Sequence, residues 1–252
     1  MRTARLQIHG IARDLLRADR RETPAIIEFE LPTGLRDLIQ STGVPHVELG
    51  EVHVNGIVAD YTARVDDGDE IEAWSRYPLS EAPPDPAFLL DVHLGRLARY
   101  LRLFGFDTEY SPDATDADLA TRSVANRRIL LTRDRGLLMR SELEHGSFVR
   151  ATEPHRQIIE VLIRFALADA GRPLTRCLEC NGAFQPISAL EARPHVPGRV
   201  GALHDQFTRC AGCDRIYWKG SHYRRLRRLV EETEADLDVA HHDRRPVAGG
   251  LG

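Results

Sequence analysis

Aspartates occur where two predicted strands end. Asp91 closes the apolar run FLLD, and Asp134 follows the run RILLT at residues 128–132. A third acid, Asp116, opens the helix expected before the second of these strands. Ligands of open parallel sheets bind beyond the carboxyl ends of the strands, so the three carboxylates are expected at one edge. A hard divalent cation, Mg²⁺ or Mn²⁺, would relieve their mutual repulsion and assist hydrolysis of a phosphodiester.

Each of these aspartates also has an ordinary structural explanation. Asp116 and Asp134 could cap helices, and Asp91 could accept a hydrogen bond in a turn. A phosphatase would usually place a D-x-D nucleophile directly after the first strand, whereas this chain has Val92 and His93 after Asp91. The shared placement at strand ends is what favours an acidic site over three unrelated caps.

The cysteines form two C-x-x-C pairs. They are Cys177, Cys180, Cys210 and Cys213. In a cytosolic chain such pairs indicate metal ligands before disulfides, and four thiolates fit one tetrahedral zinc ion with no open position for catalysis. An iron–sulfur or redox role is the alternative. His195 and His204 lie between the pairs and are predicted to be ordinary loop histidines.

Positive charge is concentrated near these cysteines. Residues 171–228 carry 11 basic and 4 acidic side chains, whereas the whole chain has a net charge of −4. The segment RIYWKGSHYRRLRR at residues 215–228 interleaves aromatic and basic side chains, a pattern typical of single-stranded nucleic-acid binding. Alternatively, the aromatic side chains pack the ribbon onto the core, and the arginines lie on a solvated face of the helix. The predicted nucleic-acid contacts are Arg215, Trp218, Lys219, Arg224 and Arg225.

Residues 1–79 have the pattern of a small β-rich unit. Alternating apolar residues in ARLQIHG and AIIEFE predict two strands, and Thr33 is positioned to cap a helix over residues 35–40. Asn55 and Gly56 then separate two β-rich runs, which is a strong hairpin signal. The segment VDDGDEIEAW supplies a last strand.

This order of elements resembles the ubiquitin-like β-grasp of small sulfur carriers, in which V-x-V-N-G is followed by D-G-D-x-I. Sulfur carriers end the fold in a free Gly-Gly, whereas the last strand here continues into residues 74–78. The resemblance therefore implies a module that docks a protein partner rather than one that carries sulfur.

The middle of the chain alternates strand and helix, which predicts an α/β domain with a parallel sheet. Strands are expected at residues 88–91, 106–110, 128–132 and 148–151, and helices at residues 94–104, from Asp116 onward, and at 154–170.

The predicted layout therefore has six parts. They are a β-grasp domain (1–79), a proline-rich linker (80–87), the α/β domain (88–172), a zinc ribbon (173–220), a helix that is basic and then acidic (221–238), and a disordered tail (239–252). No apolar run reaches the roughly 18–20 residues of a membrane helix, and the N-terminus lacks the apolar core of a secretory signal. The sequence thus predicts a cytoplasmic protein without membrane contact.

The segments FLLDVHLGRLARYLRLFGFDTEY and RILLTRDRGLL resemble the Mut-seven C-terminal RNase domain family, over about residues 87–220. The resemblance implies a PIN-like ribonuclease domain, a zinc ribbon and a ubiquitin-like domain in front. Carried across, the PIN acids are Asp91, Asp116 and Asp134. Asp118 is a fourth candidate, because the stretch DATDADLA offers two positions for the central acid.

The same resemblance makes Arg96 and Arg133 candidate phosphate contacts. The function predicted is a metal-dependent ribonuclease whose ribbon helps to bind RNA. The alternative is a non-catalytic RNA-binding or adaptor protein that keeps the PIN-like scaffold. The acidic cluster favours the enzyme, because a binder gains nothing from carboxylates that repel phosphate.

Overall fold

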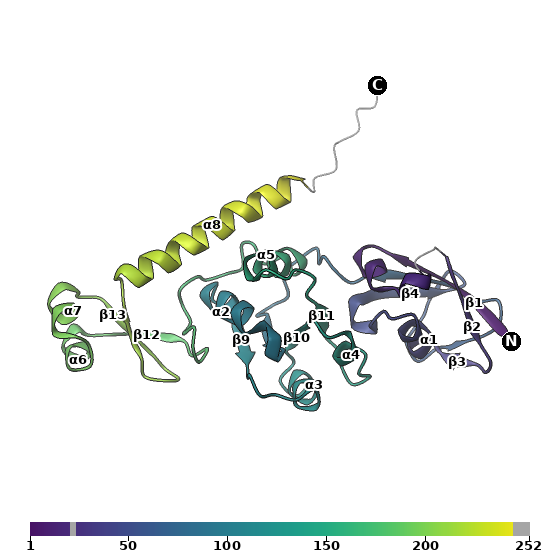
Figure 1. The fold of residues 1–252 in the computed structure, drawn as a ribbon, viewed down its shortest axis with the longest axis horizontal. Coiled ribbons are helices and arrows are strands. Elements are labelled where there is room, and N and C mark those ends of the chain that lie inside the picture. Colours follow the sequence, from purple (N-terminus) through teal and green to yellow (C-terminus); the bar gives the residue numbers. More distant parts are fainter. Residues whose placement is uncertain (21–23, 244–252) are drawn as a thin grey trace, which may run out of the picture.

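The computed structural model describes residues 1–20 and 24–243 of the chain. Its elements form three consecutive units, with the N-terminal unit at the right of Figure 1 and a long C-terminal helix running back over the middle unit. None of the helices in these residues combines the length and apolarity needed to cross a membrane.

The N-terminal unit is a mixed sheet with helix α1 packed on one face. Its elements are β1 (Arg2–His9), β2 (Ala25–Phe29), β3 (Thr33–Gly34), α1 (Leu35–Ser41), β4 (Leu49–Val54), β5 (Ile57–Val58), β6 (Arg64–Val65) and β7 (Glu70–Ser75), with 3-10 turns at Ile11–Leu15, Ala18–Arg20 and His46–Glu48. The strand order is β2-β1-β7-β4-β5, with β1 and β7 parallel. Leu6 and Ile71 from this sheet pack with Leu38 of α1. The unit is the predicted ubiquitin-like β-grasp.

Two local features of this unit were predicted with different success. The hairpin is confirmed, since Asn55 and Gly56 connect β4 to β5 with φ of 53° and 77°, as a tight hairpin turn requires. The predicted cap is wrong, because Gly34 is the N-cap of α1 and Thr33 pairs with Val65 in a short ladder. Carbonyls of the β5–β6 connection accept the first N–H groups of α1 instead.

The middle unit is the predicted α/β domain. Its elements are β8 (Ala87–Leu90), a 3-10 turn (Val92–Leu94), α2 (Gly95–Leu103), β9 (Asp107–Tyr110), α3 (Asp116–Ala125), β10 (Ile129–Thr132), α4 (Arg135–Leu138), β11 (Gly146–Phe148) and α5 (Pro154–Arg164). The sheet order is β11-β10-β8-β9, and each neighbouring pair is parallel.

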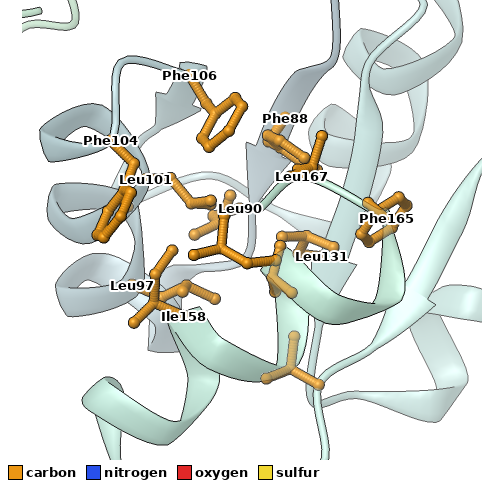
Figure 2. Packing of buried hydrophobic residues seen from close by; sticks show 14 of the residues in the cluster. Phe88, Leu90, Leu97, Leu101, Phe104, Phe106, Leu131, Ile158, Phe165 and Leu167 are labelled. Carbon is orange, nitrogen blue, oxygen red and sulfur yellow. The ribbon is translucent and has the colours of Figure 1, made fainter. Parts of the chain in front are cut away.

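Both faces of the parallel sheet are covered by helices. Phe88, Leu90 and Leu131 pack with α2 and α5, as Figure 2 shows, whereas Leu89 and Leu130 pack with α3 and α4. Successive residues of a strand point to opposite faces, so burial on both sides explains the uninterrupted apolar runs FLL and ILL.

Two helix boundaries differ from those predicted. Thr115, rather than Asp116, caps α3, because its hydroxyl accepts the backbone N–H of Asp118 at 3.2 Å and the Asp118 carboxylate bonds back to Thr115. Helix α5 ends at Arg164 instead of residue 170, since Ala166 takes a left-handed conformation with φ of 54°.

The third unit is an antiparallel ribbon. Its elements are β12 (Phe184–Ile187), α6 (Ala189–Ala192), a 3-10 turn (Arg193–His195), α7 (Gly198–Leu203), β13 (Phe207–Cys210) and β14 (Ile216–Trp218). The strand order is β12-β13-β14, and the cysteines lie at the turns near these strands. This is the architecture expected of the predicted ribbon.

Buried polar groups attach the ribbon to the edge of the α/β sheet. The guanidinium of Arg102, on the buried side of α2, donates to the carbonyls of Leu178 (3.0 Å), Glu179 (2.9 Å) and Thr108 (3.0 Å). The backbone N–H of Thr108, in β9, donates to the side chain of Asn181 at 3.0 Å. The first C-x-x-C turn is therefore held directly against α2 and β9.

Helix α8 (Ser221–Asp243) returns from the ribbon to the α/β domain and packs along α5. Val230 and Leu237 are buried there, and His155 Nε2 lies 2.8 Å from Asp236 Oδ2. The predicted helix end is too early, since residues 239–243 are helical and Ala240 still packs on the core. The rest of the predicted tail, 244–252, lies outside the described residues.

Gly105 provides a test of the ribbon attachment. It has φ of +87°, and a Cβ there would lie 2.1 Å from the carbonyl oxygen of Arg172. We expect Gly105→Ala to lower the free energy of unfolding by about 2–4 kcal/mol, because left-handed strain adds to a backbone clash. Gly68 has the same φ of +87° with nothing within 4 Å, so Gly68→Ala should cost only about 1 kcal/mol. Urea denaturation compares the two variants, and equal losses would contradict the prediction.

Candidate functional site

Thr132 joins two aspartates at the carboxyl edge of the parallel sheet. Its hydroxyl donates to Asp91 Oδ2 at 2.6 Å and accepts the backbone N–H of Asp134 at 2.9 Å. Asp91 directly follows β8, and its own N–H donates to Leu131 of β10 at 3.0 Å. The structure thus brings Asp91 and Asp134 to one end of two neighbouring strands. The sequence analysis missed Thr132, although a hydroxyl residue between ILL and RD was a readable signal.

Asp91 is a buried carboxylate whose charge is balanced by few hydrogen bonds and by no ion pair among the described residues. Its side chain is 4% exposed, and Thr132 supplies the sole hydrogen bond to it from residues 1–20 and 24–243. No basic side chain in that part of the chain forms an ion pair with it. Burying an unpaired carboxylate costs several kcal/mol, so this position suits a carboxylate that a bound cation would compensate.

Asp134 has two roles available to its two oxygens. Oδ1 accepts the backbone N–H of Gly136 at 2.7 Å, so Asp134 caps α4. Among the described residues Oδ2 has no hydrogen-bond partner. The side chain is exposed, which leaves the second oxygen accessible to a ligand.

Asp116 and Asp118 differ in their environment at the start of α3. Asp118 Oδ2 accepts the hydroxyl of Thr115 at 2.7 Å and its backbone N–H at 3.2 Å, and these hydrogen bonds lower the pKa of Asp118. Asp116 is exposed and has no hydrogen bond or ion pair to the described residues. The helix cap therefore uses Asp118, whereas Asp116 is available to a ligand.

The carboxylates do not form a closed cluster. Where the structure describes the chain, the four cysteines are the one group of three or more metal-ligand side chains whose atoms all lie within 4.8 Å of one another. Asp91 and the backbone of Asp134 are linked through Thr132, but Asp91, Asp116 and Asp134 do not all lie within that spacing of one another.

The two arginines predicted to contact phosphate have different surroundings. Arg96 is exposed in the first turn of α2, five residues after Asp91, with no partner in the described part of the chain. Arg133 instead donates through Nη1 to the carbonyls of Val149, Arg150 and Ala151. Its guanidinium thus holds the backbone that follows β11.

The four cysteine Sγ atoms fit one tetrahedral metal ion. Cys177 and Cys213 are separated by 3.8 Å and Cys180 and Cys210 by 3.2 Å. A Zn–S bond of about 2.3 Å in a tetrahedron places sulfur atoms about 3.8 Å apart. The turns leave no room for larger residues, because a Cβ on Gly182 would lie 2.7 Å from Cys210 Sγ. The four thiols can therefore hold one metal ion.

The surroundings of the cluster favour the thiolate at Cys177 and disfavour it at Cys180. Burial raises the pKa of the Cys177 thiol, but hydrogen bonds from the hydroxyl of Tyr217 and from the backbone N–H groups of Cys180 and Glu179 outweigh burial and lower it to about 7. Burial raises the pKa of Cys180 to about 12. Four thiolates can coexist in this space only with a cation among them.

A groove of about 1250 Å³ lies between the ribbon and the start of α8. Three of the residues predicted to contact nucleic acid, Arg215, Trp218 and Lys219, line it, whereas Arg224 and Arg225 are exposed on α8 and do not. The sequence analysis missed the basic and aromatic lining residues that come from distant segments, which are Arg99, Arg176, Arg209, Phe184 and Phe207. Tyr217 and Tyr223, from the aromatic and basic segment at residues 215–228, also line the groove.

The fold and these sites together define a class of protein. It has a parallel α/β domain with acids at its carboxyl edge, preceded in the chain by a ubiquitin-like domain and followed by a cysteine ribbon. The family model described as Mut7-C RNAse domain matches residues 86–230, and that described as Mut7-C ubiquitin matches residues 1–83. The chain belongs to the Mut7-C RNAse domain family. Comparison with curated proteins and with solved structures finds no match.

The cysteine cluster is expected to bind one divalent ion per chain. Titration with Co²⁺, a spectroscopic substitute, should give a thiolate-to-metal absorption band that saturates at one equivalent and disappears in Cys210→Ser. Tyr217→Phe removes only the hydroxyl that contacts Cys177 at 3.0 Å, and should weaken Co²⁺ binding about 10- to 100-fold without changing the stoichiometry. Acidification should release the ion as the thiols take up protons. A band that survives Cys210→Ser would contradict this assignment.

Proposed function

We propose that the chain is a metal-dependent ribonuclease that hydrolyses RNA phosphodiester bonds at the carboxyl edge of the parallel sheet. The observation that carries the proposal is the buried carboxylate of Asp91, which is joined through the Thr132 hydroxyl to the backbone of Asp134 and lacks a basic partner among the described residues. Membership of the Mut7-C RNAse domain family supports nuclease-like chemistry and RNA as the substrate.

Asp91, Asp116 and Asp134 are the proposed ligands of Mg²⁺ or Mn²⁺. Bound there, the ion would activate water and stabilise the negative charge on the phosphate. Asp91 contributes a fixed oxygen, Asp134 contributes the Oδ2 that the helix cap leaves open, and exposed Asp116 can rotate towards the ion. Asp118 remains a fourth acid whose hydrogen bonds cap α3, so we assign the central position to Asp116.

Arg96 is the proposed phosphate contact, because it is exposed and follows Asp91 at the start of α2. An arginine there would neutralise phosphate charge next to the acids. Arg133 would contact phosphate through Nε or Nη2, because its Nη1 already donates to three carbonyls.

The ribbon is proposed to hold a structural Zn²⁺ and to bind single-stranded RNA in its groove. Trp218 and Tyr223 offer aromatic rings for base stacking, and Arg215 and Lys219 offer positive charge for the backbone. Bases inside a duplex are already stacked on their neighbours, so aromatic rings in the groove favour single strands. Arg224 and Arg225 would extend the positive surface along α8.

Two further assignments are proposed for the whole chain. Paired thiols that serve as metal ligands are typical of a reducing compartment, which supports a cytoplasmic location. The ubiquitin-like domain would receive a protein partner at its β5 edge, where Ile57 and Val58 are 73% and 65% exposed. Exposed apolar residues on a sheet edge are suited to pairing with another chain.

Cleavage assays test the acidic site. With labelled single-stranded RNA and Mg²⁺ or Mn²⁺, Asp91→Asn and Asp134→Asn should each lower the cleavage rate about 100-fold or more, because each removes a charged metal ligand. EDTA should stop cleavage by the unmodified chain. Asp113→Asn, an exposed acid in the loop before α3, is the matched control and should cut normally. RNA binding without cleavage, equal in all variants, would favour the non-catalytic alternative.

Binding assays test the groove separately from the chemistry. In the cleavage-deficient Asp91→Asn background, Trp218→Ala should weaken binding of single-stranded RNA about 5- to 100-fold, since one stacked base contributes about 1–3 kcal/mol. Arg199→Ala removes an exposed arginine of the ribbon outside the groove and should have little effect. Equal affinities for Trp218→Ala and Arg199→Ala would place RNA binding elsewhere.

A further inference from the structure

Glu48 of the ubiquitin-like domain is buried inside the α/β domain. The residue is 0% exposed and ends the 3-10 turn His46–Glu48. Its Oε1 accepts the backbone N–H of Phe148 at 2.5 Å and the hydroxyl of Ser147 at 3.2 Å. Its Oε2 accepts Arg164 Nη2 at 3.0 Å and lies 3.5 Å from Arg150 Nη2. One carboxylate thus contacts β11, the segment after it and the end of α5.

The position of Glu48 matters because β11 is an edge strand. The sheet order is β11-β10-β8-β9, so β11 has a neighbouring strand on one side only. Backbone N–H groups on the other side need an acceptor, and Glu48 supplies it for Phe148. The ubiquitin-like domain therefore substitutes a side-chain carboxylate for the missing strand.

Phe148 is also next to the acidic edge. It is the register partner of Thr132 in the β10–β11 pair, and Val149 N donates to the carbonyl of Thr132 at 2.8 Å. Thr132 in turn bonds Asp91 Oδ2 and Asp134 N. The path from Glu48 to the two aspartates consists of adjacent hydrogen-bonded groups.

Other contacts of the ubiquitin-like domain hold the segment around Asp134. Arg135, the residue after it, donates to the carbonyl of Leu15 at 3.0 Å. At the far end of α4, Gln40 Nε2 donates to the carbonyl of Met139 at 3.0 Å. The domain therefore contacts both ends of the helix that Asp134 caps.

Apolar packing follows the same surface. Val47 is fully buried in the cluster formed by Leu89, Leu130, Leu137 and other residues of the α3–α4 face. A residue of the ubiquitin-like domain thus completes the core beneath the acidic edge. This contact is continuous with Glu48 in the chain and in space.

We propose that Glu48 is a positioning residue for the acidic edge, through which the ubiquitin-like domain holds Phe148, Thr132 and the two aspartates in the geometry needed for cleavage. This role rests on the proposed ribonuclease function. It makes the domain a fixed part of the nuclease site, in addition to any partner that binds its exposed β5 edge.

The test uses the full chain with Glu48→Gln, which keeps an oxygen acceptor for Phe148 but loses the charge facing Arg164. Amide hydrogen exchange at Thr132, Asp134 and Phe148 should become about tenfold faster or more, as local opening becomes easier. The kcat for RNA cleavage should fall about 10- to 100-fold, with KM and RNA affinity unchanged, because the groove is untouched. Glu28→Gln, an exposed acid on β2, is the control and should change neither measurement.

Hydrogen exchange separates this proposal from the ribonuclease proposal. If the unmodified chain cuts no RNA, the ribonuclease function fails, while faster exchange confined to residues 132–151 still supports the positioning contact. Unchanged exchange at Thr132 and Phe148 in a folded Glu48→Gln overturns the proposal, and so does faster exchange with an unchanged kcat in an active enzyme.

A second variant covers the case in which Glu48→Gln fails to fold by circular dichroism. Ser147→Ala removes one donor to Glu48 Oε1 and the acceptor of Arg164 Nη1 at 2.7 Å, but it keeps Arg164 Nη2 facing Glu48 Oε2 at 3.0 Å. It should shift exchange at Phe148 and kcat in the same direction by a smaller factor, with KM unchanged. No shift in either quantity would count against the proposal.

Discussion

The hydroxyl of Thr132 connects the two strand ends on which the acidic edge depends. A hydroxyl can donate one hydrogen bond and accept others through its lone pairs. Here the Thr132 hydroxyl donates a hydrogen bond to the Asp91 carboxylate and accepts one from the backbone N–H of Asp134. The same residue closes β10, whose register with β8 sets Leu131 against Leu90. A slip of that register would separate the two acids, so the buried apolar strands and the acidic edge require the same alignment.

The parallel sheet has two open edges, and a different appended unit closes each of them. At β9 the ribbon contributes Asn181, which accepts the N–H of Thr108. At β11 the ubiquitin-like domain contributes Glu48, which accepts the N–H of Phe148. Unpaired strand edges promote aggregation, so both units complete the central domain as well as carrying sites of their own. The order of the three units along the chain thus matches their order in space.

Local patterns in the sequence were sufficient for most elements and insufficient for the contacts between them. Apolar periodicity predicted β8, β9, β10, α2, α3 and α5, whereas the strand predicted at residues 148–151 lies at Gly146–Phe148. Asn55-Gly56 predicted the hairpin, and the C-x-x-C pairs predicted the clustering of four cysteines that the structure contains. Thr115 was missed as a cap, although T-x-x-D was readable. Arg102 and Glu48 could not be found in this way, since their partners lie up to 116 residues away and pairing at that separation leaves no periodic signal. The convergence of Asp116 with Asp91 and Asp134 remains a prediction.

Helix α8 gives the ribbon a second attachment. The chain enters the ribbon beside α2, where Arg102 holds the first C-x-x-C turn, and leaves it through α8, whose Leu237 is buried against the α/β core. A unit attached at two separated points cannot rotate about a single hinge. The ribbon is therefore held in a fixed orientation relative to the α/β domain. Helices α2 and α8 consequently fix the distance between the groove and the acidic edge. A single RNA strand bound in the groove would therefore reach the acidic edge at a set number of nucleotides from the groove.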